Sequence, residues 1–159
     1  MIAQSLVNDM VEAIQICPKN LYEADYCQWL ENTLEQLRQG KYEGVDWDNL
    51  LEEIEAMGRS EKRGLKSNLI VVVLHLLKWQ YQPEKCSGSW ESSLIEHRRR
   101  IKEALKESPS LKPYFSQILE ESYTESVKQA KAETGLPITR FPQKCPYSLN
   151  SILNDEFLP

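Results

Sequence analysis

Two histidines and one glutamate are the residues whose types and spacing best suit metal chemistry. His75 lies about ten residues before a predicted turn near 85–86, and His97 lies about eleven residues after it. If the two flanking helices are antiparallel, they carry these histidines at a similar height. The same count across the next turn, near 108–109, brings Glu121 to that level. Zn²⁺ and non-haem iron accept neutral imidazole together with carboxylate. A metal-dependent hydrolase using these three ligands is therefore one alternative. No helix carries the Glu-x-x-His spacing of dinuclear sites, so we expect no metal and no cofactor.

Three neighbouring glutamates form a second candidate site. Glu52 and Glu55 have the ExxE spacing that can hold Mg²⁺ against a substrate pyrophosphate in a nucleotide-processing enzyme. A second acidic pair is missing, because no aspartate occurs between Asp48 and Asp155. We therefore favour a structural interpretation, in which Glu52 and Glu55 face water and Glu53 pairs with an Arg or Lys of a neighbouring helix.

The basic run 98–100, followed by Lys102, is the third candidate. Successive helical residues are turned by about 100°, so the run surrounds the helix and forms no single phosphate-facing stripe. We expect Arg98 to lie over Trp90 or to pair with a glutamate such as Glu53. A nucleic-acid-associated regulator is thus a second alternative, and the net charge of −5 disfavours nucleic acid as a partner.

A polar row follows one edge of the most apolar predicted helix. Asn68, His75 and Gln82 are seven residues apart, with Lys78 and Trp79 beside them. Such a row can be a groove that recognises a partner, or a set of hydrogen bonds that fixes helix register. We favour the register role, because buried polar groups nearly always find partners. The candidate binding residues from all these patterns are Glu53, Asn68, His75, Lys78, Trp79, Gln82, Trp90 and Arg98.

Helical periodicity runs through almost the whole chain, with capping residues between the segments. Asn20, Ser60 and Ser89 are the expected N-caps, and Gly58 is expected to end the short helix before it. The β-branched run 70–73 lies inside a helical period, so no strand is predicted. The predicted helices cover about 2–16, 20–40, 46–57, 60–81, 89–108 and 111–134.

These segments predict an all-α fold, organised as one helical domain over residues 1–159. Its centre is an up-and-down bundle of four main helices, which begin near Leu21, Ser60, Ser89 and Leu111 and are crossed by the short helix around Trp47. Residues 1–18 form a helical appendage. Residues 136–159 form an irregular, proline-spaced arm that we expect to pack on the bundle.

Length and composition limit the classes of protein to which the chain can belong. With 159 residues, of which 41% are hydrophobic, the chain suits one compact domain that can build a core without disulfides. The four cysteines lack any CxxC pair and are interpreted as reduced thiols. No window approaches the roughly 20 apolar residues that span a bilayer, and no signal peptide is visible. We therefore expect a cytoplasmic protein with no membrane partner.

The order and spacing of several motifs resemble the bacterial "domain of unknown function" family twenty-nine, which is abundant in cyanobacteria. The resemblance runs from about Leu21 to Pro159 and implies an all-helical domain from a bacterial cytoplasm, without implying an activity. His97 departs from it, since a Gln is expected there. The motifs are Leu21-Tyr22-Glu23-x-Asp25, Glu52-Glu53-Ile54-Glu55-x-Met57-Gly58-Arg59-Ser60, His75-Leu76-Leu77-Lys78-Trp79-Gln80-x-Gln82-Pro83, Ser89-Trp90, Arg98-Arg99-Arg100-Ile101, Gly135-Leu136-Pro137 and Cys145-Pro146-Tyr147.

The function that these observations favour is a non-catalytic, helical protein-interaction or regulatory module of a bacterial cytoplasm. No nucleophile with a base, no glycine-rich phosphate loop and no complete metal set is visible in the sequence, so we lean away from an enzyme. The expected partner is an unknown protein, or a second copy bound through the N-terminal helix. That helix carries an apolar stripe in need of a cover, formed by Ile2, Leu6, Met10 and Ile14.

Overall fold

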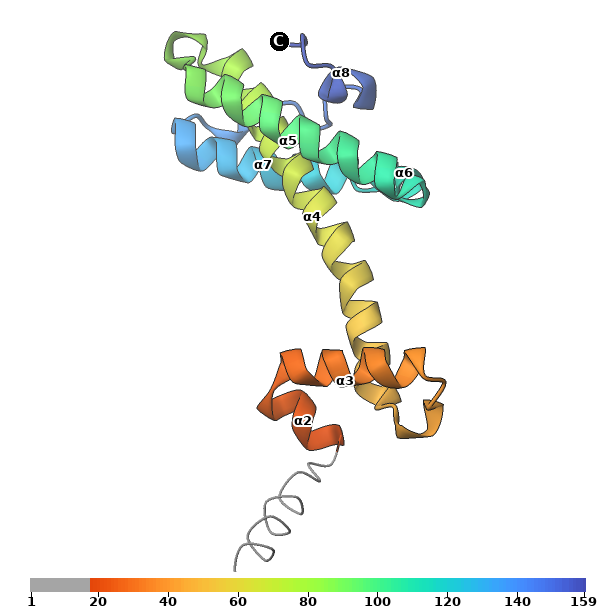
Figure 1. The fold of residues 1–159 in the computed structure, drawn as a ribbon. Coiled ribbons are helices and arrows are strands. Elements are labelled where there is room, and N and C mark those ends of the chain that lie inside the picture. The colour runs from red at the N-terminus through yellow and green to blue at the C-terminus, as the bar shows by residue number, and fades with distance from the viewer. Residues whose placement is uncertain (1–17) are drawn as a thin grey trace, which may run out of the picture. The chain divides into compact units, whose positions relative to one another are not determined.

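The computed structural model of the protein describes residues 18–159, which form α-helices, short 3₁₀ turns and no strand (Figure 1). The predicted all-α class is therefore confirmed. The predicted helix 2–16 and its proposed self-association lie outside the described residues. Within residues 18–159, no helix is both long enough and apolar enough to cross a membrane. The described cysteines Cys27, Cys86 and Cys145 are free thiols.

The chain divides into two compact units, one ending at Met57 and the other running from Gly58 to Pro159. The first contains α2 (Pro18–Ala24), α3 (Tyr26–Arg38), the 3₁₀ turn η1 (Tyr42–Gly44) and the start of α4 (Trp47–Tyr81). Because each unit is compact in itself, the two are described separately. The organisation of residues 1–159 as a single domain stays a prediction.

Helix α3 begins later than the sequence suggested. Asp25 adopts an extended backbone (φ −151°), and its carboxylate accepts a hydrogen bond from the backbone N–H of Gln28 at 3.0 Å. This N-cap separates α2 from α3. The predicted start at Asn20 was wrong, because Asn20 falls inside α2 and the nearby aspartate supplies a better capping geometry.

Helix α4 is one continuous helix, where the sequence predicted a short helix 46–57 and a separate long one. Gly58 and Ser60, the expected caps, lie inside it. A glycine ends a helix when its φ is positive, as at Gly135 (φ +73°) after α7 (Leu119–Thr134), and Gly58 does not share that conformation. A helix of 35 residues tolerates its two interior glycines, Gly58 and Gly64, at about 1 kcal/mol each.

The second unit adds the helices that surround the C-terminal half of α4. These are α5 (Gly88–Glu107), α6 (Lys112–Gln117), α7 and the short α8 (Leu149–Leu153), with 3₁₀ turns η2 (Pro83–Lys85), η3 (Pro109–Leu111) and η4 (Ile138–Arg140). The predicted helix 111–134 is divided at Ile118. The N-cap of α5 is Ser87, so Ser89 lies in its first turn.

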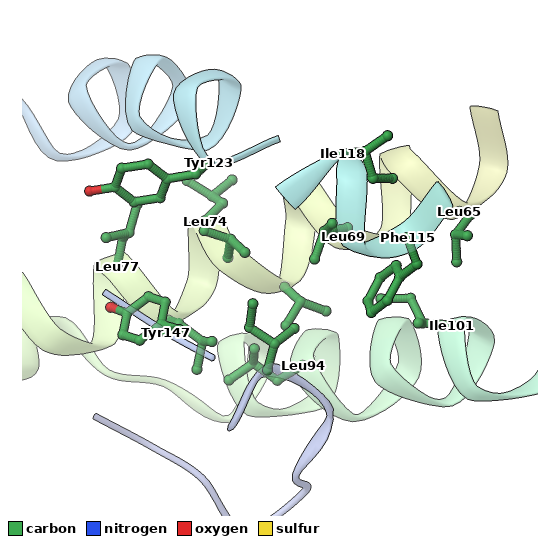
Figure 2. Packing of buried hydrophobic residues seen from close by; sticks show 14 of the residues in the cluster. Leu65, Leu69, Leu74, Leu77, Leu94, Ile101, Phe115, Ile118, Tyr123 and Tyr147 are labelled. Atoms are coloured by element: carbon green, nitrogen blue, oxygen red, sulfur yellow. The ribbon is translucent and has the colours of Figure 1, made fainter. Parts of the chain in front are cut away.

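The core of the second unit lies between α4, α5, α6, α7 and the C-terminal arm (Figure 2). The apolar stretch of α4 is buried on most sides, with Leu69, Val72 and Leu76 fully excluded from solvent. Phe141 and Tyr147 of the arm belong to the same cluster. Helices α2 and α3 belong to the first unit, whereas the prediction had also placed the helix that begins near Leu21 in this bundle.

Candidate functional site

The predicted polar row of α4 connects that helix to its neighbours in the second unit. Asn68 Oδ1 lies 2.7 Å from His97 Nδ1 on α5, and the Asn68 amide donates to the carbonyl of Gly64 at 2.7 Å. Gln82 Nε2 donates to the carbonyl of Thr134, the last residue of α7, at 3.1 Å. Two of the three row members thus make the inter-helix contacts that a register role requires.

His75, the third member of the row, lies in a mixed aromatic and charged environment. Its ring centroid is 6.3 Å from that of Trp90, and its Nδ1 has no hydrogen-bond partner among the described residues. Lys78 Nζ lies 4.4 Å from the Trp90 ring centroid and 2.5 Å from Glu133 Oε2. Burial, reinforced by the Lys78 charge, lowers the pKa of His75 to about 4. The imidazole is therefore neutral at pH 7.

The alternative metal ligands are not brought together. Glu121 Oε1 forms an ion pair with Lys66 Nζ at 2.6 Å, and His97 Nδ1 is hydrogen-bonded to Asn68 Oδ1. Within the part of the chain that the structure describes, no group of three His, Cys, Asp or Glu side chains is arranged to hold a metal ion. The structure therefore does not bring His75, His97 and Glu121 into one cluster, because height along helices does not determine which face each side chain occupies.

Arg98 is buried and holds the C-terminal arm. Only 1% of the residue is exposed. Its Nε donates to the carbonyl of Ile152 at 2.8 Å, Nη1 to that of Asp155 at 3.2 Å and Nη2 to that of Phe157 at 2.8 Å. Both expected partners, Trp90 and Glu53, were wrong. The acceptors lie more than fifty residues away, in the short helix α8 and the residues after it, and the helical periodicity of α5 does not indicate which distant segment packs against Arg98.

The remaining basic side chains of the run are paired with carboxylates. Arg99 contacts Glu96 and Glu103 at 2.9 and 2.7 Å, and Arg100 contacts Glu96 at 2.7 Å. Lys102 pairs with Asp155 at 2.6 Å. These ion pairs neutralise the run, so it does not present the cationic surface that the nucleic-acid hypothesis requires.

Glu53, in the first unit, is held by two tyrosines. It accepts hydrogen bonds from Tyr22 Oη at 2.5 Å and Tyr26 Oη at 2.9 Å, so its predicted pairing with an Arg or Lys was wrong. The two hydroxyls lower the pKa of Glu53, and the bond to Glu53 raises the pKa of Tyr22 to about 12. The buried Trp29 packs edge-on against the Tyr22 ring, 4.8 Å between centroids. This cluster anchors the start of α4 on α2 and α3.

Beside this anchor, α4 exposes a row of large apolar side chains, which we call the α4 stripe. Positions 47, 51 and 54 are spaced by four and three, so they share one helical face, and position 57 borders it. The Trp47 indole is fixed by a hydrogen bond from Nε1 to the carbonyl of Tyr42 at 3.1 Å. The stripe consists of Trp47, Leu51, Ile54 and Met57, exposed to 46, 57, 56 and 67% respectively.

The spacing of these four residues places them along one side of α4. The structure leaves the face open to solvent. The sequence signal that accompanies this exposure is charge, because residues 42–58 contain six carboxylates and no basic side chain. Between residues 18 and 57, ten carboxylates stand against three basic residues, whereas residues 58–159 carry twelve against sixteen.

Comparison with known proteins supplies a family and no activity. The family model described as "Domain of unknown function DUF29" matches residues 21–158, which confirms the resemblance inferred from the motifs. Neither the curated proteins nor the solved structures gave a match.

Proposed function

Since the chain belongs to the DUF29 family, whose description assigns no activity, we propose from its own geometry that it is a non-catalytic protein-interaction or regulatory module. The proposal includes the expected site of action, a bacterial cytoplasm. Its single supporting observation is the α4 stripe, four large apolar side chains that are each about half exposed or more.

Isolated exposed apolar residues are ordinary, and a contiguous group of them is informative. The largest apolar patch on a monomer covers about 300–600 Å² and is often functional. The stripe is contiguous because its members are one helical turn apart, and it is rigid because Tyr22 and Tyr26 hold the adjacent Glu53. A rigid, exposed apolar face loses little conformational entropy when it is covered, which favours binding.

The candidate polar residues of the second unit have structural contacts. Asn68 and Gln82 join helices, and Arg98 joins α5 to the arm. These contacts explain the residues as parts of the fold. The α4 stripe, by contrast, is exposed, and its contiguous apolar side chains are the reason for proposing a binding function.

The experiment is an affinity purification of the full chain from cells that carry its gene. The test variant combines Leu51→Glu with Ile54→Glu, two positions that are exposed and can accept the charge without unfolding the unit. The control variant is Ile95→Glu, which places the same charge at an exposed isoleucine of α5 outside the stripe. Ile95 is 54% exposed. Proteins retained by the wild type and the control should be lost with the stripe variant. An identical set with all three baits would overturn the proposal.

A further inference from the structure

We propose that α4 contains a hinge at residues 58–60, where the helix opens and recloses while both compact units stay folded. The hinge is a conformational property of α4, and it does not depend on the proposed binding function. Three observations carry the inference: this part of α4 is exposed, it contains residues that end and begin helices, and it lies between two tertiary contacts of the helix.

The middle of α4 has no buried side chain over two consecutive helical turns. All eight residues from 57 to 64 are exposed, whereas Leu65, the next residue, is only 2% exposed. Helices in proteins obtain most of their stability from the packing of a buried face, because short isolated helices are marginal in water. Residues 57–64 therefore depend mainly on their own backbone hydrogen bonds, and segments of this kind open most readily.

The two glycines of α4 lie in this same segment and weaken it further. Gly58 and Gly64 each lower the helix-forming equilibrium by about fivefold relative to alanine. A glycine inside a helix can allow the close approach of another segment. That explanation does not apply here, because a Cβ added at either position would meet no atom within 4 Å. What remains at Gly58 is conformational freedom.

Gly58 and Ser60 are suited to end one helix and begin the next, although both lie inside the continuous α4. In an open form, Gly58 can adopt the left-handed conformation that satisfies the last carbonyls of the helix before it. Ser60 Oγ can then accept a hydrogen bond from the backbone N–H of Lys62 or Arg63. Glu61 would lie at the new N-terminus, where a carboxylate is favourable. These caps replace part of the hydrogen bonding that opening breaks, so α4 opens more easily here than at positions without them.

The hinge lies between two contacts that hold α4. On its N-terminal side, Glu53 accepts hydrogen bonds from two tyrosines of the first unit. On its C-terminal side, Lys62 Nζ lies 5.5 Å from the ring centroid of Tyr114 on α6. The boundary between the two compact units also falls at positions 57 and 58. Opening at 58–60 therefore preserves both contacts and the core of each unit.

The test is hydrogen exchange of the full chain, followed by NMR at pH 7. A break at 58–60 removes the acceptors of the backbone N–H groups of residues 59–63, because each helical N–H bonds to the carbonyl four residues earlier. In the wild type, these amides should exchange at least about tenfold faster than the amides of 53–56 and 66–69 on either side.

Three variants distinguish a hinge from general weakness of the segment. Gly58→Ala should slow the exchange of 59–63 by about tenfold or more, because alanine stabilises the closed helix and disfavours the left-handed conformation of the open form. Ser60→Ala removes the cap of the open form and should slow it by about fivefold. Gly64→Ala is the matched control. Since position 64 is helical in both forms, this variant should leave the exchange of 59–63 unchanged.

Trypsin gives a second measurement, because Arg59 places a cleavage site inside the hinge. Cleavage requires an open backbone, and its rate follows the population of the open form when reclosing is fast. Trypsin should cut after Arg59 before it cuts after Arg99 or Arg100, which are also exposed on a helix. Gly58→Ala should slow the cut after Arg59 by about tenfold, and Gly64→Ala should not change it.

Two results would overturn the inference. Uniform protection of the amides from 53 to 69 would show that α4 does not open at 58–60. Equal slowing of exchange by Gly58→Ala and Gly64→Ala would show that the exposed segment unfolds as a whole, without a defined hinge.

Discussion

The same helix is a core element in one unit and an open surface in the other. Leu69, in the second unit, is completely buried, whereas Leu51, eighteen residues earlier on α4, is 57% exposed. Both belong to apolar faces with helical spacing. The comparison shows that periodicity identifies which side chains share a face, while coverage of that face depends on what packs against it.

The two units also differ in where their charged side chains lie. The second unit uses its polar side chains internally, as when Lys78 pairs with Glu133 and Arg98 binds the arm. In the first unit, most carboxylates remain at the surface around an apolar stripe, and Glu53 alone is drawn into the tyrosine cluster. The second unit therefore contains the larger buried core, whereas the first unit exposes an apolar stripe among carboxylates.

The largest expected effect tests the core directly. Leu69→Ala should lower the free energy of unfolding by about 4 kcal/mol, because it removes a fully buried side chain and leaves a cavity. Leu51→Ala, the same substitution on the same helix, should change it by less than about 0.5 kcal/mol. Urea unfolding followed by circular dichroism measures both. If both variants lost a similar free energy of unfolding, the α4 stripe would be covered in solution. The contrast between the two ends of α4 would then be contradicted.

The next effect concerns the arm of the second unit. Arg98→Ala should cost about 3 kcal/mol, because three backbone carbonyls lose a charged donor in a buried place. Limited proteolysis should then cut residues 150–159 faster than in the wild type. Arg99→Ala, an exposed residue paired on its own helix, serves as the control and should leave proteolysis unchanged. Unaltered cleavage with Arg98→Ala would contradict the proposed anchoring.

A smaller effect depends on pH. The pKa of His75 is about 4 in the folded protein, against an ordinary value of 6.5, so between these values the unfolded chain binds a proton that the folded protein does not. Stability should therefore fall as the pH drops from about 6.5 to 4, by about 1 kcal/mol once solvent screening of the half-buried ring is allowed for.

His75→Gln should flatten that slope without removing it, because burial also lowers the pKa of His97. Urea unfolding of both proteins at pH 7 and pH 5 provides the measurement. An equally steep decline in the variant would show that other groups cause the pH dependence.

The smallest effect examines the boundary between the units. Gly58→Ala should stabilise the protein by about 0.5–1 kcal/mol, because Gly58 lies inside α4 and an added Cβ meets no atom within 4 Å. Gly135→Ala should destabilise it by about 1 kcal/mol, since Gly135 has φ +73°. Thermal unfolding of both variants gives the signs. A loss of stability at position 58 would indicate that the helix ends there.

The site was only partly predictable, and the reason differs from residue to residue. The spacing of Asn68 and Gln82 indicated an edge that faces other helices, and both residues make inter-helix bonds. The partners of Glu53 and Arg98 were mispredicted. Tyr22 lies 31 positions from Glu53 along the chain, and the acceptors of Arg98 lie more than fifty positions from it, so local periodicity could not identify either contact.

The sequence alone determined the all-α class, the apolar centre of α4 at 69–77 and the membership of the family, because these depend on local periodicity and on the order of motifs. Tertiary structure decided that Gly58 does not interrupt α4, that Arg98 binds the arm and that the α4 stripe is open. Those outcomes depend on which distant surfaces meet. A helical pattern fixes the direction in which a side chain points along its own helix, and burial is settled by what lies opposite.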